Sequence, residues 1–416
     1  MAAIADVRPL PSEAPISPAI RADADNSEFN LLLACCSDPT GEEHAERMRQ
    51  ILSRPLDWER VLALVDHHRV VPQVYGELSR YSHLIPAPRF DALRLRYQNN
   101  ARKTLWFTAE LIRIISHLKL AGIKTLPYKG PVLAETLYGE VTRREFGDLD
   151  ILILPADVPR AKAALRDLGY EPALELGAGM ETAYIKSGYE YSFNVMSRPN
   201  LLELQWRIVP RFYSVDFNVA DFFDRADEVN FGVCSVRTLC AEDLLLVLCV
   251  HAAKHVWIQL SWLCDIARLI DSRSLDWQAI FDEARRLGIE RILTLNLLLA
   301  HKLLGSPVPY GPLAEDPQTA VLADEILRVI ERSSHYDTES IAYFRLMMRL
   351  RERWQDRVRF LWRLALTPSV SEWSAVRFPK LLHPLYRLVR LWRVAKRLAL
   401  ADDKHRNTKA EFSGCC

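Results

Sequence analysis

Two carboxylates one residue apart, Asp148 and Asp150, stand at the start of the apolar run 151–154. Alternate side chains of a β-strand point to the same face, so the two carboxylates would lie side by side on a strand. Mg²⁺ binds hard oxygen ligands of this kind. The pattern also fits two solvated carboxylates at the end of a strand. Together with other anion- or metal-binding residues, it would indicate phosphoryl or nucleotidyl transfer.

Lys129 and Gly130 follow the short segment 123–128, which we expect to be a strand, and precede a helical segment at 132–138. The N-terminus of a helix presents unpaired N–H groups and a positive dipole to an anion. Gly130 lets a phosphate approach the backbone, and Lys129 adds a mobile positive charge. The same residues could form an ordinary turn, but their place before the aspartate strand favours phosphate binding.

Glu203 lies within another apolar, strand-like segment, 202–206. Sites with two divalent ions share carboxylates that hold the attacking and leaving oxygens in line, so a third carboxylate would complete the set begun by Asp148 and Asp150. Glu190, in the segment 184–195 that also alternates like a strand, is the alternative third ligand. Glu203 is better flanked by apolar residues and is the preferred choice.

Several short motifs occur in one order along the chain: Lys129-Gly130, Leu137-Tyr138-Gly139, Arg144 before Gly147-Asp148-Leu149-Asp150, Leu202-Glu203-Leu204-Gln205-Trp206-Arg207, and His251-Ala252-Ala253-Lys254-His255 before Trp262 and Asp265. In combination they resemble the bacterial family of uncharacterised nucleotidyltransferases, which belongs to the DNA polymerase β-like nucleotidyltransferase superfamily. The resemblance covers residues 28–300. Two positions depart from it, because Lys129-Gly130 replaces the superfamily's Gly-Ser turn and Gln205 stands where the family often has His.

The resemblance implies an α+β fold, with a small mixed sheet as the nucleotidyltransferase core and helical regions on both sides. It also implies that Asp148, Asp150 and Glu203 hold two Mg²⁺ ions. An acceptor hydroxyl of unidentified origin would attack the α-phosphorus of an NTP such as ATP, and pyrophosphate would leave. Lys129 and Gly130 would bind the triphosphate.

Arg144, Lys254 and His255 are further candidates for nucleotide binding. Arg144 is close in sequence to the aspartate pair and would clamp phosphate, whereas Lys254 and His255 would reach the nucleotide or the acceptor from a helix. His251 and His255 have the i, i+4 spacing that can bind Zn²⁺. Because Ala252 replaces the glutamate of an H-E-x-x-H motif, pocket or core histidines are preferred over a zinc site.

The apolar pattern divides the chain into a disordered arm at 1–27, an N-terminal helical region at 28–120, an α/β core at 121–235, a C-terminal helical domain at 236–400 and a disordered tail at 401–416. Within these regions we expect a long helix over 90–120, a strand over 184–195 and a final helix over 384–400.

The bulk composition is that of a globular protein. Of 416 residues, 49% are hydrophobic and 26% are charged, enough to bury a full core. The net charge of +1 provides no general attraction to nucleic acid or membranes. Eight cysteines without a C-x-x-C pair indicate a reducing compartment. With no signal peptide or transmembrane segment in the pattern, we expect a cytoplasmic protein.

The segment 377–397 near the C-terminus is strongly basic. It contains no acidic residue and seven basic ones: Arg377, Lys380, Arg387, Arg390, Arg393, Lys396 and Arg397. The simplest interpretation is a terminal helix folded on the body of the protein. An apolar stripe beside the basic residues also fits attachment to an anionic membrane surface, and RNA is a third partner to consider.

The leading hypothesis is a Mg²⁺-dependent nucleotidyltransferase. One alternative is a catalytically inactive module that binds a nucleotide or a partner, which would show no NTP turnover. Another is a toxin-like nucleotidyltransferase that acts on tRNA or protein, which would transfer label from an NTP to total RNA or protein.

Overall fold

The computed structural model describes residues 26–37, 41–195, 198–231, 234–309, 316–333 and 340–367, with residues 386, 387 and 389. The arm at 1–25, the tail at 401–416 and most of the basic segment 377–397 lie outside the described residues, as does most of the helix expected over 384–400. The described chain is mainly helical with a five-stranded mixed sheet in its middle, which confirms the expected α+β class.

Helices surround the sheet on both sides. Five begin with a side chain that accepts a hydrogen bond from a first-turn N–H: Asp57, Asn218, Asp276, Asp316 and Ser340. The α-helices are α1 (Ser27–Cys36), α2 (Glu42–Leu52), α3 (Trp58–His68), α4 (Val71–Leu78), α5 (Ala87–Leu120), α6 (Gly130–Tyr138), α7 (Val158–Asp167), α8 (Ala178–Ser187), α9 (Val219–Arg225), α10 (Ala241–Lys254), α11 (Leu260–Ser272), α12 (Trp277–Leu287), α13 (Glu290–Leu304), α14 (Pro317–Glu331), α15 (Ile341–Arg349) and α16 (Trp354–Leu366). Short 3-10 turns are η2 (Ser79–Leu84), η3 (Val141–Arg143), η4 (Pro155–Asp157) and η5 (Arg211–Tyr213).

The sheet has the strand order β1-β2-β5-β4-β3. Its strands are β1 (Leu126–Pro127), β2 (Leu149–Leu152), β3 (Tyr170–Pro172), β4 (Glu190–Val195) and β5 (Arg198–Gln205). Strands β2 and β5 are parallel, and the other neighbouring pairs are antiparallel. A separate hairpin of β6 (Asp227–Phe231) and β7 (Cys234–Thr238) is tied to the sheet where the Thr238 hydroxyl donates to the Pro127 carbonyl over 2.8 Å.

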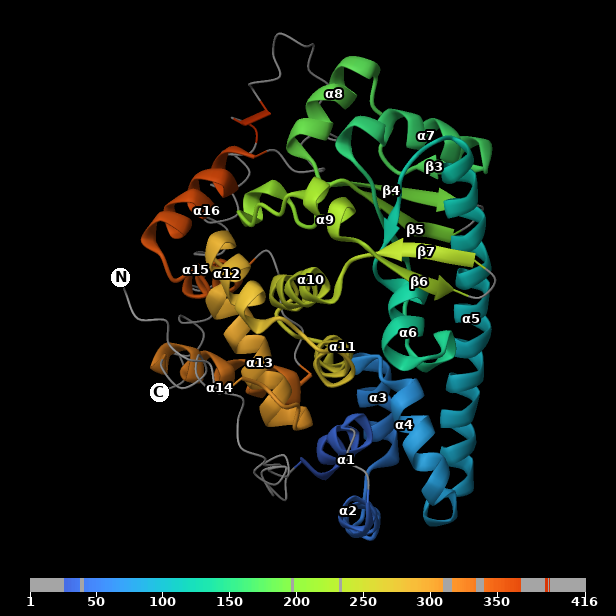
Figure 1. Ribbon diagram of the computed structural model, residues 1–416. Helices are drawn as coiled ribbons and strands as arrows, with labels where there is room; N and C mark the ends of the chain where they lie inside the picture. Colours follow the sequence, from blue (N-terminus) through green and yellow to red (C-terminus); the bar gives the residue numbers. More distant parts are fainter. Residues whose placement is uncertain are drawn as a thin grey trace, which may run out of the picture.

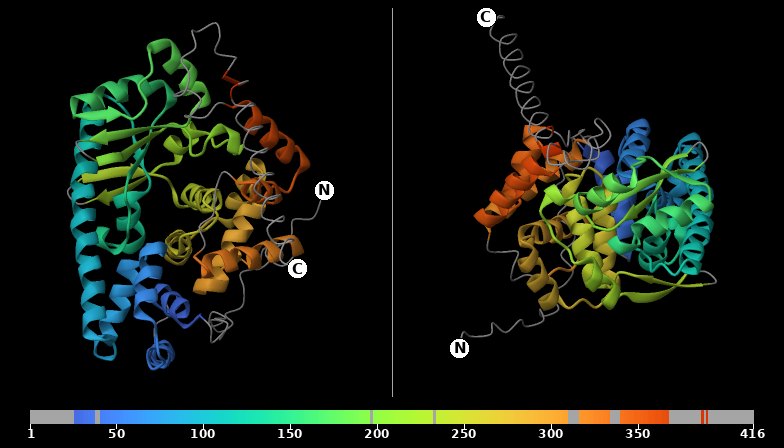
Figure 2. Two further views of the ribbon diagram at one scale, coloured as in Figure 1. Left: turned by 180° about the vertical axis from the view of Figure 1, so that it is seen from behind. Right: turned by 90° about the horizontal axis from the view of Figure 1, so that it is seen from above.

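One face of the sheet is apolar and packs against helices. Leu149, Ile151, Leu202 and Leu204 share a buried cluster with residues of α5 and α7. In Figure 1, α5 runs along the whole edge of the molecule beside the sheet. The view from above in Figure 2 shows the teal segment that contains α5 on one side of the strands, and the orange to red C-terminal helices on the other. The opposite face of the central strands is therefore turned toward α10 and the C-terminal helices.

A second buried cluster joins the two ends of the described chain. Residues from α1, α3 and α4 pack in it together with residues from α10 to α15. Figure 1 shows α10 and α11 between the sheet and the outer helices α12–α14. None of the described helices is long and apolar enough to cross a membrane.

The strand expected over 184–195 begins only at Glu190. Tyr184 and Ser187 belong to the helix α8, which ends where Gly188 follows in an extended conformation. Tyr184 is still buried because its ring packs against Tyr191, with ring centroids 5.0 Å apart. The expectation was wrong for 184–187, since a buried helical tyrosine imitated the alternation of the strand that follows.

Candidate functional site

The pairing of strands β2 and β5 places two of the candidate carboxylates opposite one another. In the parallel register Asp150 is the partner of Glu203, so both side chains lie on the face opposite the apolar cluster. Two residues further along β5, Gln205 is on the same face, and it is paired across to Glu190 of β4. Three acidic residues from three adjacent strands therefore surround one amide.

Gln205 connects these carboxylates through its buried side chain. Its Nε2 atom donates to Asp150 Oδ1 over 3.0 Å and to Glu203 Oε2 over 2.9 Å, and lies 3.5 Å from Glu190 Oε2. Its Oε1 atom accepts from the Tyr128 hydroxyl over 2.5 Å. The hydrogen bond from Tyr128 thus orients the Gln205 amide so that its NH₂ group faces the carboxylates. In this position the NH₂ group lowers the repulsion between the carboxylates.

Lys129 and Gly130 meet this cluster at the start of α6. Gly130 has φ of +55°, and a Cβ atom there would lie 3.3 Å from the carbonyl oxygen of Asp148, so the close approach of the two segments favours glycine. Lys129 Nζ lies 3.4 Å from Asp150 Oδ1 and 3.2 Å from His251 Nδ1. The structure thus brings the expected anion-binding turn directly to the aspartate pair.

Burial and mutual repulsion raise the pKa of three carboxyl groups in this cluster, those of Asp148, Glu190 and Glu203. Burial, followed by the charges of Asp150, Glu190 and Asp148, raises the pKa of Glu203 to about 9. Burial and the Asp150 charge raise the pKa of Asp148. Burial also raises the pKa of Glu190, although Lys254 opposes the effect. A group of carboxylates in this state would be stabilised by a bound cation.

Helix α10 and its C-cap residue line the far side of the cluster with His251, Lys254 and His255. Burial lowers the pKa of Lys254, whose Nζ lies 5.3 Å from the centre of the Tyr189 ring. Burial and the neighbouring lysines lower the pKa of His255 to about 3 and that of His251 well below its usual value. Both imidazoles are therefore neutral near pH 7, and both pack against Trp262 with ring centroids 5.3 and 5.4 Å away.

The backbone after His255 turns through two left-handed residues, Val256 and Trp257, with φ of 56° and 50°. Left-handed conformations are uncommon for residues other than glycine, and rarest for β-branched ones. The turn is anchored because Trp257 is fully buried and its Nε1 donates to Asn296 Oδ1 over 2.7 Å. It directly follows Lys254, the last residue of α10, and the C-cap residue His255.

Arg144 lies in a buried ion pair. Its Nε donates to both oxygens of Asp265 over 2.9 and 3.1 Å, and its Nη2 donates to Oδ2 over 2.8 Å. The Tyr138 hydroxyl adds a fourth hydrogen bond to Asp265, of 2.9 Å. Burial opposes the charged form of Arg144, but the Asp265 carboxylate outweighs it and raises the pKa of Arg144. The ion pair connects the loop before β2, which contains Arg144, to α11, which contains Asp265.

Comparison with known families gives one match. The family model described as "uncharacterised nucleotidyltransferase" matches residues 54–305, well over half of the chain. The chain belongs to the uncharacterised nucleotidyltransferase family. No curated protein and no solved structure matches it.

Nucleotidyltransferases of this kind are typically metal-dependent, and the chemistry of the cluster fits a hard divalent cation. In the part of the chain that the structure describes, no three His, Cys, Asp or Glu side chains are spaced to hold a metal ion jointly. Asp150 contacts Lys129 and Gln205 instead, and Glu203 contacts Gln205. The ligand atoms on offer are nevertheless carboxylate oxygens, which suit Mg²⁺, and the raised pKa values of Asp148 and Glu203 fit a site that gains positive charge.

Two site residues of this nucleotidyltransferase-family chain were not selected from the sequence. Gln205 was noted only as a replacement for His, and Tyr128 was not considered. Both carry a sequence signal, because Gln205 is two residues from Glu203 on one strand and Tyr128 directly precedes Lys129. Period-2 alternation would have placed the amide beside the carboxylate.

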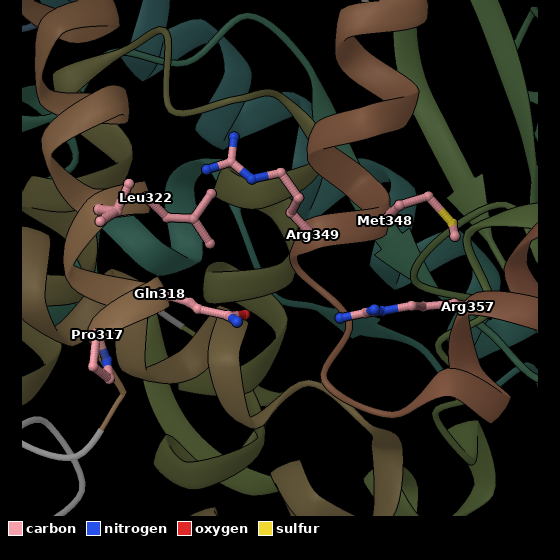
Figure 3. Close-up of a pocket in the computed structure, with 7 residues that line it drawn as sticks. Pro317, Gln318, Leu322, Met348, Arg349 and Arg357 are labelled. Carbon is pink, nitrogen blue, oxygen red and sulfur yellow. The ribbon is translucent and has the colours of Figure 1, made fainter.

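A cavity of about 390 Å³ lies elsewhere, beyond the end of the family match (Figure 3). It is lined by residues of α14, α15 and α16: Pro317, Gln318, Val321, Leu322, Met348, Arg349 and Arg357. None of the residues of the carboxylate cluster contributes to its walls.

Proposed function

We propose that this protein is a Mg²⁺-dependent nucleotidyltransferase that moves NMP from an NTP to a hydroxyl acceptor. The observation that supports this most is the in-register pairing of Asp150 with Glu203, next to Lys129 at the N-terminus of α6. Family membership supports the reaction class. The geometry also supports it, because Lys129 at the start of α6 lies 3.4 Å from Asp150 and a helix N-terminus can bind an anion.

In this proposal Asp148, Asp150 and Glu203 hold the metal, with Glu190 as the alternative third carboxylate. When bound, Mg²⁺ would neutralise the triphosphate and stabilise charge on the transferring phosphorus. The acceptor oxygen bonds to the α-phosphorus, the bond to the pyrophosphate oxygen breaks, and the acceptor proton passes to a carboxylate oxygen of Glu203. Glu203 must first lose its own proton, which burial opposes by raising its pKa and which a bound cation would favour.

Basic side chains on the other side of the cluster are proposed to bind the nucleotide. Lys129 Nζ and the N–H groups at the start of α6 would hold the β- and γ-phosphates. Lys254 and His255 extend from α10 toward the same face and would contact the nucleotide or the acceptor. For Arg144 a phosphate contact would have to come from Nη1, since its Nε and Nη2 are engaged by Asp265.

The test is transfer of label from α-³²P NTPs, for each of the four bases, to acceptors in a cell lysate. Wild type should label an acceptor and release pyrophosphate, whereas Asp148→Ala and Asp150→Asn should not. Asp167→Asn is a matched control, because this exposed carboxylate lies in the same α/β unit at the end of α7. Equal labelling by wild type and Asp150→Asn would refute the proposal.

A second candidate function is nucleotide binding without turnover. It is favoured by the contacts of Gln205 and Lys129, which occupy the carboxylate oxygens that a metal would use. In that case ATP would bind to the full-length chain in a calorimetric titration, the affinity would fall in Lys129→Met, and no pyrophosphate would be released with any acceptor. Pyrophosphate release that depends on Asp148 would exclude this candidate.

A further inference from the structure

Helix α16 exposes a continuous apolar stripe. Four of its large hydrophobic side chains are largely exposed: Trp354 at 69%, Val358 at 54%, Leu361 at 49% and Trp362 at 68%. Their spacing of i, i+4, i+7 and i+8 places all four on one face of the helix. A contiguous exposed apolar surface with two tryptophans indicates an interaction site rather than scattered surface residues.

The opposite face of α16 packs into the core. Phe360 and Leu364 are buried, and the guanidinium of Arg351 lies 4.1 Å from the centre of the Phe360 ring. Arg363 adds an ion pair of 2.7 Å to Asp216. The inner face of α16 therefore packs against the rest of the protein. Because that face is held in place, Trp354 and Trp362 on the other face point outward.

The borders of the stripe are basic. Arg359 is exposed on one flank, and the exposed Arg353 and the partly exposed Arg357 lie four residues apart on the other. Asp356, the one acidic residue of α16, is buried and lies 3.6 Å from Arg359. The chain that follows α16 continues this charge, because 377–397 contains seven basic residues and no acidic one.

The cavity of about 390 Å³ adjoins the stripe at Arg357. Figure 3 shows Arg349 and Arg357 extending toward it from different elements, with Leu322 and Met348 at its sides. Arg349 is paired with Glu325 over 2.6 Å. An opening with two guanidinium groups and an apolar lining fits the phosphate and upper acyl chain of an anionic amphiphile.

We propose that the outer face of α16, with the adjoining cavity, docks this protein on an anionic membrane surface. The helix lies in the plane of the interface, Trp354 and Trp362 enter at headgroup depth, and the flanking arginines contact lipid phosphates. A second copy of the chain fits less well, because packing two such stripes face to face would bring their basic borders together. RNA fits less well because an apolar stripe without a basic groove offers little to a phosphate backbone. This inference does not depend on the proposed reaction.

The experiment is co-sedimentation of the full-length protein with vesicles. One set contains phosphatidylcholine alone, and the other contains phosphatidylcholine mixed with phosphatidylglycerol. The double variant Trp354→Ser/Trp362→Ser should bind the anionic vesicles at least about tenfold more weakly than wild type, since each tryptophan loses the burial of a large apolar surface. The matched control Leu105→Ser/Leu120→Ser removes two exposed hydrophobic residues of α5 and should bind as wild type does.

Charge is tested with Arg353→Gln/Arg359→Gln, which should weaken binding to anionic vesicles and reduce its dependence on salt. Far-ultraviolet circular dichroism and thermal unfolding of each variant show whether it folds. The proposal is overturned if wild type does not sediment with anionic vesicles, or if the tryptophan variant binds equally well. It is also overturned if the tryptophan substitutions instead dissociate a dimer in light scattering, or if tRNA binds while anionic vesicles do not compete.

Discussion

The buried pair of Arg144 and Asp265 allows a sharp test of how the two halves of the molecule are held together. Asp265 is fully buried and accepts three hydrogen bonds from Arg144 and one from Tyr138. The pair joins residues 121 positions apart, connecting the loop before β2 to α11. The perturbation is Asp265→Ala, which leaves a buried guanidinium without a counter-charge and a buried hydroxyl without its acceptor.

Removing one partner of a buried ion pair costs about 3–5 kcal/mol. A hydroxyl left without its acceptor costs about 1–3 kcal/mol more, but neighbouring losses overlap, so the two figures do not add fully. We therefore expect Asp265→Ala to lower the free energy of unfolding by about 4 kcal/mol. Asp265→Asn keeps the shape and one acceptor oxygen, and we expect a smaller loss of about 2–3 kcal/mol.

The assay is urea unfolding followed by tryptophan fluorescence and circular dichroism. The double variant Arg144→Met/Asp265→Leu replaces both charges by apolar groups and should recover most of the loss, because no charge is then left buried alone. A loss below about 1 kcal/mol in Asp265→Ala would refute the reasoning, since it would mean that water or movement satisfies Arg144. A double variant as unstable as Asp265→Ala would refute it too.

Three other predictions concern the carboxylate cluster. Glu203→Gln should be more stable than wild type by about 1–3 kcal/mol near pH 8, with the gain disappearing below the unfolded pKa. The sign follows because burial raises the pKa of Glu203 from 4.5 to about 9. The wild-type protein therefore loses stability as the pH rises from 4.5 toward 9, whereas Glu203→Gln does not. If the difference in unfolding free energy between the two proteins did not change with pH in urea unfolding, the prediction would be contradicted. Gln205→Leu should cost about 1–3 kcal/mol, because Tyr128 loses its acceptor and the carboxylates lose a shared donor, and MgCl₂ should reduce that cost in a thermal-shift assay. The ring protons of His255, whose pKa is about 3, should not titrate between pH 5 and 8 in NMR spectra, and a midpoint near 6.5 would contradict the burial described for it.

The features that the sequence predicted well are local ones. The alternation around Asp150 and around Glu203 determines which residues share a face, and the structure confirms the α+β class that follows from such segments. Gly130 was expected at the start of a helix, and it does begin α6, with a positive φ beside Asp148. These inferences needed only the repeat of a strand and the start of a helix.

The features that the sequence did not predict depend on contacts between distant residues. Nothing in the local pattern shows that Arg144 would meet Asp265, so it was expected to face a phosphate. The part played by Tyr128 depends on β1 lying antiparallel to β2, which brings its hydroxyl to Gln205. The hairpin β6–β7 was also missed. The exposed stripe of α16 was missed because the sequence of an apolar helix face is the same whether that face is buried or exposed.

The most direct test of the central claim is the binding of Mn²⁺, as a stand-in for Mg²⁺, measured by electron paramagnetic resonance in the presence of a non-hydrolysable NTP analogue. We expect about two bound ions per chain in wild type, with affinity rising as pH increases because Glu203 must ionise. Asp150→Asn should lose this binding, and Asp167→Asn should keep it. Equal Mn²⁺ binding by wild type and Asp150→Asn would show that the cluster formed by Asp148, Asp150 and Glu203 is not the metal site.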